Sequence, residues 1–170
     1  RAVLDRVLKN PRPLSGPIVV IVDTRQIVPD FVDEFAKAME RKPKIVAFGY
    51  ASNALGTVNP VRKLTKMAKD AGALVYIDAV QYAPHGPIDV QDLGCDFLVC
   101  SSYKFFGPHA AALYGRYDLL NELKPYKVRP ASNELPYKFE TGTQNHEGIA
   151  GVLGALEYFE WIGNQFGQGQ

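Results

Sequence analysis

The hydrophobic positions along the chain follow two alternating periods. Short apolar runs rich in β-branched residues, "PIVVIVD" (17–23) and "KIVAFGY" (44–50), predict buried strands. Between these runs the apolar residues instead recur at the spacing of one helix face, and Asp30 stands where it can cap the helix start. The residues on that face are Phe31, Val32, Phe35, Ala36 and Met39. This part of the chain is therefore expected to form a strand, a helix and a second strand.

The second helix has recognisable start and stop signals. Asn59 and Pro60 occupy the expected cap and first-turn positions, and Gly72 is expected to end the helix in a left-handed conformation. The apolar stripe between them predicts a buried face. It consists of Val61, Leu64, Met67 and Ala68.

The alternation continues to the end of the sequence. Further strands are predicted at 73–77, 96–101 and 110–115, and short helices at 89–94 and 116–123. A long loop follows at 124–146, and a final helix at about 147–162 has an apolar side. That side carries Ile149, Val152, Leu153, Leu156 and Phe159.

Strands and helices in alternation predict an α/β fold with a mostly parallel sheet and helices on both faces. The 170 residues suffice for one domain with its own core. In such sheets ligands bind beyond the carboxyl ends of the strands, so these ends are where functional side chains are expected.

Composition and charge exclude some classes of protein. The net charge is +1 and the basic residues form no stripe, which argues against a nucleic-acid-binding protein. The apolar runs are too short to cross a bilayer, so no membrane association is expected. Cys95 and Cys100 lie five residues apart, on opposite faces of one predicted strand, and so do not suit a disulfide. A reducing cytoplasmic location is expected for such a chain.

Polar side chains gather after three of the predicted strands. Asn53 follows the strand 44–50, Asp78 and Gln81 follow the strand 73–77, and Ser101 and Lys104 follow the strand 96–101. Pyridoxal phosphate requires an amine that forms a Schiff base, a carboxylate that pairs with its ring nitrogen and a hydroxyl that binds its phosphate. The residue types leave simpler interpretations open, because the aspartate could serve its own turn and the lysine could be merely exposed.

Three segments resemble blocks of one known family. They are "ASNALGTVNPV", "FETGTQN" and "GALVYIDAVQYAPHGPIDVQDLGCDFLVCSSYKFFGPHAAALYGR". Over roughly residues 44–160 the chain resembles the class V pyridoxal-phosphate-dependent enzymes, in particular the cysteine desulfurase-like branch. The resemblance implies that residues 17–170 form the central part of the large, cofactor-binding domain of the fold-type I enzymes. The chain would then contain this domain only in part. Residues 1–16 match poorly.

The resemblance also implies a role for each residue at the strand ends. Lys104 would form the Schiff base and shuttle the proton, and Asp78 would pair with the pyridine nitrogen. Gln81 would hydrogen-bond the ring hydroxyl oxygen. Asn53 would lie near that hydroxyl and the carboxylate of an amino-acid substrate.

The phosphate site implied by the resemblance draws on two subunits. Ser101 and Tyr103 would bind the phosphate from within the chain, and Thr143 would reach the phosphate of a neighbouring subunit, which implies a homodimer. Tyr103 stands where many family members have a histidine, and Tyr50 likewise replaces a position that is often histidine. A phenol can donate to phosphate, but unlike an imidazole it does not titrate near neutrality.

Two functions of different class are consistent with these residues. The first is a pyridoxal-phosphate-dependent lyase or transferase, and the second is a truncated or degenerate domain that serves only for dimerisation or binding. Several parts of the family pattern have no counterpart here, namely a Gly/Thr phosphate loop, a substrate-binding arginine and a sulfur-accepting loop cysteine. A metal site built from Asp23, Asp78 and Asp96 is not favoured, because Asp96 opens its strand and so lies at the opposite edge of the sheet from Asp78.

Overall fold

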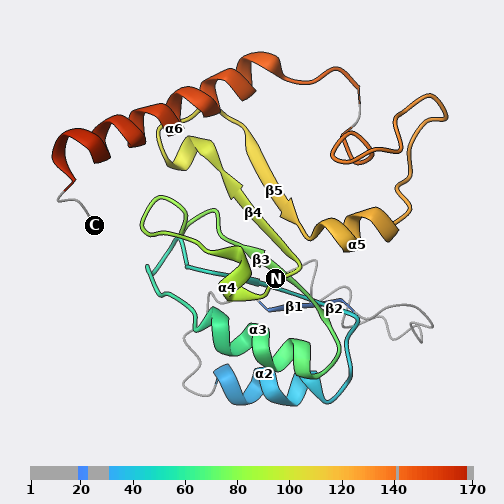
Figure 1. Ribbon diagram of the computed structural model, residues 1–170. Coiled ribbons are helices and arrows are strands. Elements are labelled where there is room, and N and C mark those ends of the chain that lie inside the picture. Colours follow the sequence, from blue (N-terminus) through green and yellow to red (C-terminus); the bar gives the residue numbers. More distant parts are fainter. Residues whose placement is uncertain (1–18, 23–30, 141, 168–170) are drawn as a thin grey trace.

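The computed structural model describes residues 19–22, 31–140 and 142–167. Its centre is a five-stranded sheet in the order β1-β2-β3-β4-β5 (Figure 1). The first four strands are parallel and β5 runs antiparallel to β4. The strands are β1 (Val19–Val22), β2 (Ile45–Gly49), β3 (Leu74–Asp78), β4 (Phe97–Ser101) and β5 (Ala111–Gly115). The predicted α/β class with a mostly parallel sheet is confirmed.

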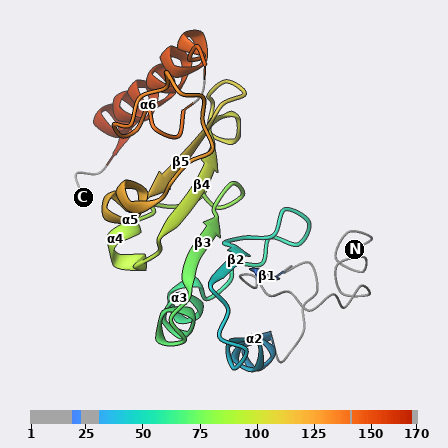
Figure 2. The same ribbon diagram turned by 90° about the vertical axis from the view of Figure 1, so that its right-hand side faces the viewer.

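The helices connect the strands in the expected order. They are α2 (Phe31–Met39), α3 (Val61–Asp70), α4 (Val90–Leu93), the single-turn 3-10 helix η1 (Ser102–Lys104), α5 (Tyr117–Glu122) and α6 (His146–Phe166). Figures 1 and 2 show α2 and α3 side by side on one face of the sheet, and α6 beyond β5 at the far side of the molecule. None of the described helices combines the length and the hydropathy needed to cross a bilayer.

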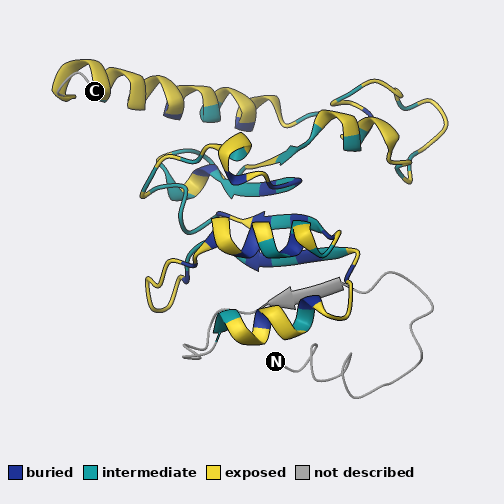
Figure 3. Ribbon diagram, turned by 60° about the horizontal axis from the view of Figure 1, so that its bottom comes forward, coloured by how far each residue is buried: buried dark blue, intermediate teal, exposed yellow. Residues whose placement is uncertain are grey.

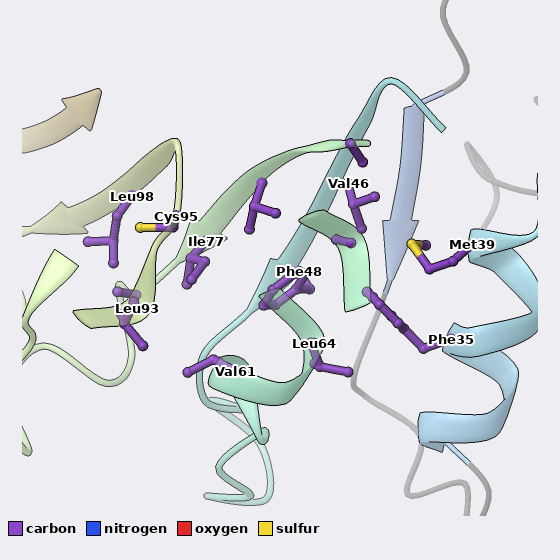
Figure 4. Packing of buried hydrophobic residues seen from close by; sticks show 14 residues of the cluster. Phe35, Met39, Val46, Phe48, Val61, Leu64, Ile77, Leu93, Cys95 and Leu98 are labelled. Carbon is purple, nitrogen blue, oxygen red and sulfur yellow. The ribbon is translucent and has the colours of Figure 1, made fainter. Parts of the chain in front are cut away.

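The core lies between the sheet and the helices α2 and α3 (Figure 4). On β2 and β3 every second side chain is buried, while the others are partly buried or, at Asp78, exposed, so one face of these strands packs more tightly than the other. The strands contribute Val46, Phe48, Val75 and Ile77, and the helices contribute Phe35, Met39, Val61, Leu64 and Ala68. This packing fixes β3 and β4, whose ends carry the candidate site.

The predicted start of α3 was wrong. Pro60, not Asn59, is the cap residue of α3, and no side chain caps the helix. Asn59 is buried and donates its side-chain N–H to the carbonyl oxygen of Gly49 at 2.7 Å, so the amide holds the following loop against β2 instead. Gly72 has the predicted left-handed conformation, with φ at 81°. The proposed cap residue Asp30 lies outside the described residues.

The apolar side of α6 is mostly exposed (Figure 3). The helical period was predicted correctly, and the helix extends to Phe166 rather than to about 162. Ile149, Leu153 and Leu156 are each more than half exposed, because α6 buries only Gly148 and Ala155 among the described residues. Periodicity identifies the apolar face of a helix, but it does not show that the chain supplies a partner for that face.

Candidate functional site

The carboxyl ends of β2, β3 and β4 meet at one edge of the sheet. Gly49 pairs with Asp78, and Asp78 pairs with Val99, two residues before the end of β4. The backbone continues this ladder beyond the strands, since the N–H of Tyr50 donates to the carbonyl of Asp78 at 2.8 Å. Asp78 and the segment leading to Lys104 therefore follow neighbouring strands, as the sequence predicted.

A pocket of about 500 Å³ opens at this edge, between the loop 50–58 and the turn 79–85. Asn53 and Gln81 share it, so two of the predicted site residues lie on one cavity. Its full lining is Ala51, Ser52, Asn53, Gly56, Val58, Gln81, Tyr82 and His85. Asp78, Ser101 and Lys104 lie at the same edge of the sheet but do not line this pocket.

A tyrosine pair joins the two walls of the pocket. The rings of Tyr50 and Tyr82 are parallel within 3° and their centroids are 3.8 Å apart. Burial, followed by the contact with Tyr82, raises the pKa of Tyr50 above its usual value, so the Tyr50 ring is a neutral phenol at physiological pH. Because Tyr82 directly follows Gln81, the stack restricts the position of that amide. In the sequence Tyr50 stood out only as a departure from the family pattern, and no signal pointed to Tyr82.

The carboxylate of Asp78 is exposed and only partly engaged. One oxygen accepts a hydrogen bond from the backbone N–H of Val80 at 3.0 Å, and the other accepts none from the described residues. The turn-stabilising interpretation of this aspartate is thus correct for one oxygen. The second oxygen is available to a ligand at the strand ends.

Lys104 ends the 3-10 turn that follows β4. Its side chain is partly buried, and Nζ lies 5.0 Å from the centre of the Tyr103 ring, within the range of a cation–π contact. The Ser101 hydroxyl donates to the carbonyl of Ala110 at 3.3 Å, a long hydrogen bond. The lysine is therefore sheltered by an aromatic ring, and the serine is only loosely held by its own loop.

Ser102 anchors the loop that carries the lysine, a role that was not predicted from the sequence. The side chain is buried, and its hydroxyl lies 2.7 Å from the carbonyl of Pro108 and 3.1 Å from that of Ala110. At Gly107 a Cβ atom would lie 2.6 Å from the Cβ of Ser102, so only glycine fits there. The paired serines "SS" in the sequence were the available signal.

Thr143 is separate from the other predicted residues. It is exposed, on the segment that leads into α6, and it does not line the pocket. Its neighbour Asn145 caps α6, accepting a hydrogen bond from the N–H of Gly148 at 3.0 Å. Within one chain the structure thus brings together the strand-end residues but not Thr143.

The two cysteines are packing residues. Cys95 is 1% exposed and belongs to the core, and Cys100 is partly buried on β4. Burial raises the pKa of both thiols, so both are largely protonated at neutral pH. Neither thiol suits a role as a nucleophile. Among the described residues, no three histidine, cysteine, aspartate or glutamate side chains cluster as metal ligands would.

Comparisons with known proteins agree with this geometry. The family model described as aminotransferase class-V matches residues 16–168. A cysteine desulfurase of Pectobacterium atrosepticum is 39% identical over 140 residues, which are 75% of this chain and 34% of the relative. A probable cysteine desulfurase of Halalkalibacterium halodurans is 38% identical over 144 residues, 78% of this chain and 36% of the relative.

Solved structures show the same relationship. The cysteine desulfurase CsdA of Escherichia coli superposes with a TM-score of 0.71 at 32% identity, over 81% of this chain and 37% of that one. The apo cysteine desulfurase of Thermococcus onnurineus gives a TM-score of 0.66 at 32% identity, over 76% and 36%. The chain spans about a third of the length of the relatives that it matches. With the family model covering most of its residues, the chain belongs to the class-V aminotransferase family.

Proposed function

We propose that residues 17–170 form the central part of the cofactor-binding domain of a pyridoxal-phosphate-dependent enzyme that acts on an amino acid. The observation that supports this most is the register of β3 and β4, which puts Asp78 and the Lys104 loop at one edge, next to the pocket of Asn53 and Gln81. The relatives are named cysteine desulfurases, so cysteine is the first substrate to test. The alternative of a non-catalytic domain is not favoured, because the family model and the relatives are those of pyridoxal-phosphate-dependent enzymes and the amine, carboxylate and amides at the strand ends are retained.

The side chains at the strand ends fit the chemistry of the cofactor. The amine matches the aldehyde of the cofactor, and the carboxylate with one unengaged oxygen matches its ring nitrogen. The amides match the ring hydroxyl, and the loosely held serine hydroxyl matches the phosphate. When bound, pyridoxal phosphate supplies an electron sink for the bonds at the α-carbon of an amino acid.

Each residue then has a defined task. The Nζ atom of Lys104 would hold the cofactor through its aldehyde carbon and, as a free amine, would take up or return the proton of the substrate α-carbon. The free carboxylate oxygen of Asp78 holds a proton on the ring nitrogen. Gln81 and Asn53 orient the ring hydroxyl and the substrate carboxylate. Ser101 would turn its O–H from the Ala110 carbonyl toward the phosphate.

The phosphate site is the part that one chain leaves incomplete. Tyr103, exposed next to Lys104, can donate its phenol O–H to a phosphate oxygen. Thr143 is exposed and does not line the pocket of its own chain, which leaves it free to serve the site of a second copy. We therefore include a homodimer and a cytoplasmic location in the proposal. The free, protonated thiols suit a reducing compartment.

The test is to locate the covalent adduct. The protein is mixed with pyridoxal phosphate and reduced with borohydride, and the labelled lysine is identified by peptide mass spectrometry. Labelling should concentrate on Lys104 and disappear in Lys104→Ala. Lys63→Ala, on the exposed face of α3, is the matched control and should label Lys104 as the wild type does. Equal labelling of several exposed lysines, unchanged in Lys104→Ala, would refute the proposed site.

A further inference from the structure

The loop that carries Lys104 contains a strained backbone position. Phe106, two residues after the lysine, has φ at 65°, in the left-handed region that favours glycine. A bulky residue rarely adopts this conformation, and such strain persists only where surrounding contacts hold the backbone. Phe106 is 76% exposed, so a core does not enclose it. Specific contacts of its ring must therefore account for the conformation.

Rings on helix α6 make these contacts. Phe106 packs edge-on against Tyr158 and Phe159, with ring centroids 5.6 Å and 5.7 Å apart and planes inclined by 72° and 64°. The ring of Phe105 lies 6.4 Å from that of Phe159. Edge-on pairs at such separations are favourable, because the positive edge of one ring meets the negative face of the other. We refer to Phe105, Phe106, Tyr158 and Phe159 as the aromatic cluster.

The backbone connects the aromatic cluster to the lysine. The carbonyl of Ser102 accepts the N–H of Phe105 at 2.9 Å and the N–H of Gly107 at 2.8 Å. Lys104 lies on the turn that these bonds close, directly before Phe105. The lysine is thus held on one side through Ser102 and on the other side through the two phenylalanines of the cluster.

Resting on the function proposed above, in which Lys104 is the reactive amine, we propose that Phe159 is a positioning residue for this lysine. Its ring contacts both phenylalanines that follow Lys104, whereas Tyr158 contacts only Phe106 among the rings of the loop. Phe159 therefore holds the loop in the conformation that keeps the amine at the edge of the sheet. It acts through the backbone of the loop and does not need to touch the cofactor.

Loss of the Phe159 ring should open the loop more often. An edge-on aromatic pair changes an equilibrium by about two- to tenfold. Phe159 makes two contacts with the loop, but its ring is partly exposed, which favours the lower end of that range. Phe159→Ala should therefore raise the population with an open loop by about fivefold.

The assay is limited proteolysis with chymotrypsin, which cleaves after aromatic residues and needs an extended segment of chain. Cleavage after Phe106 requires the loop to open, whereas cleavage after Phe48, which is 3% exposed in the core, requires the sheet to open. When opening and closing are faster than cleavage, each rate follows the open population. The ratio of the loop rate to the core rate, measured by peptide mass spectrometry, should rise about fivefold in Phe159→Ala.

Two further variants separate the ring contacts from a general effect on α6. Phe159→Tyr keeps the ring and should give the cleavage ratio of the wild type. Phe166→Ala makes the same change as Phe159→Ala near the end of α6, where the ring packs on Trp161, and should also leave the ratio unchanged. The helix itself should stay in place, because it also approaches the loop where a Cβ at Gly151 would lie 2.9 Å from Pro108.

A second arm tests whether the conformation that Phe159 holds is the one that presents the amine. A ligand that binds only the closed loop lowers the open population, so pyridoxal phosphate at about ten times its dissociation constant should lower the cleavage ratio about tenfold. The wild type and Phe159→Ala should both show this protection. Lys104→Ala should show none. A residue that merely stabilised the loop, in a conformation unrelated to the cofactor, would give no protection in any variant.

Three results would overturn the inference. The cleavage ratio could be the same in Phe159→Ala as in the wild type, it could rise equally in Phe166→Ala, or pyridoxal phosphate could fail to protect the loop although borohydride labels Lys104. In each case the proposed function would stand, because labelling decides it independently. Conversely, a failed labelling experiment would refute the proposed function and with it the positioning role, while the ligand-free ratio would still decide whether Phe159 holds the loop.

Discussion

Replacing Asp96 with alanine should lower the free energy of unfolding by about 3 kcal/mol. Asp96 is completely buried at the start of β4, at the edge of the sheet opposite to the candidate site. Its carboxylate accepts hydrogen bonds from Lys69 at 2.8 Å, from Arg116 at 2.9 Å and from the backbone N–H of Val75 at 2.7 Å. This one side chain therefore connects α3, β3 and the end of β5.

The size of the effect follows from what the substitution leaves behind. The N–H of Val75 stays buried without an acceptor, at a cost of about 1–3 kcal/mol. Lys69 and Arg116 are 34% and 41% exposed, so water can solvate them and their loss is smaller than for fully buried ions. The total thus falls at the lower end of the roughly 3–5 kcal/mol typical of a broken buried pair. Domains are commonly stable by only about 5–15 kcal/mol, so the change is large.

The assay is urea unfolding followed by far-ultraviolet circular dichroism, with the slopes compared to confirm that both variants unfold in the same way. Asp118→Ala is the matched control. It removes the other carboxylate that binds Arg116, but Asp118 is 63% exposed and its loss should leave the midpoint nearly unchanged. Asp96→Asn keeps an acceptor for the Val75 N–H and should fall between the two. Equal midpoints for Asp96→Ala and Asp118→Ala would show that burial does not decide the value of these contacts.

Three further predictions concern single side chains. Asp78→Asn keeps an acceptor for its turn but loses the charge, so it should weaken pyridoxal-phosphate binding, measured by absorbance titration, without lowering the unfolding midpoint; an unchanged affinity would contradict its role. Gly107→Ala should destabilise the fold by about 1–3 kcal/mol, because the new Cβ would clash with Ser102. Gly154→Ala adds its Cβ to open space on α6 and should stabilise the fold by up to about 1 kcal/mol. Both changes are measured as shifts of the midpoint of urea unfolding. Burial raises the pKa of Cys95, so the thiol stays neutral in the folded state while it ionises in the unfolded state. The free energy of unfolding should therefore fall as the pH rises above about 8.5. This fall should be smaller in Cys95→Ala, and a fall of the same size would assign the effect to other groups.

The short-range part of the fold was predictable because it depends on local patterns. The strand at 44–50, the helix ended by Gly72 and the strand that ends at Asp78 all follow from apolar period and turn chemistry. Residue types at the strand ends also indicated the amine, carboxylate and amides of the candidate site. The resemblance to class V enzymes added the family, which the comparisons confirm.

Other features depended on contacts between residues far apart in the sequence. No local pattern predicts that Asn59 bonds Gly49 instead of capping α3, because that choice depends on where β2 ends in space. The stack of Tyr50 on Tyr82 joins two loops that meet only when β2 and β3 pair.

The sequence by itself therefore determined the elements, their parallel arrangement and the chemical types gathered at one edge of the sheet, since each depends on periodicity and chain direction. Only the tertiary structure decided that Asn53 and Gln81 share a pocket, that Ser102 fixes the lysine loop, and that His109 stacks on Tyr103. These are side-chain contacts across loops, and no local period encodes them. The same reason explains α6, whose apolar stripe was visible in the sequence although the structure leaves most of it exposed.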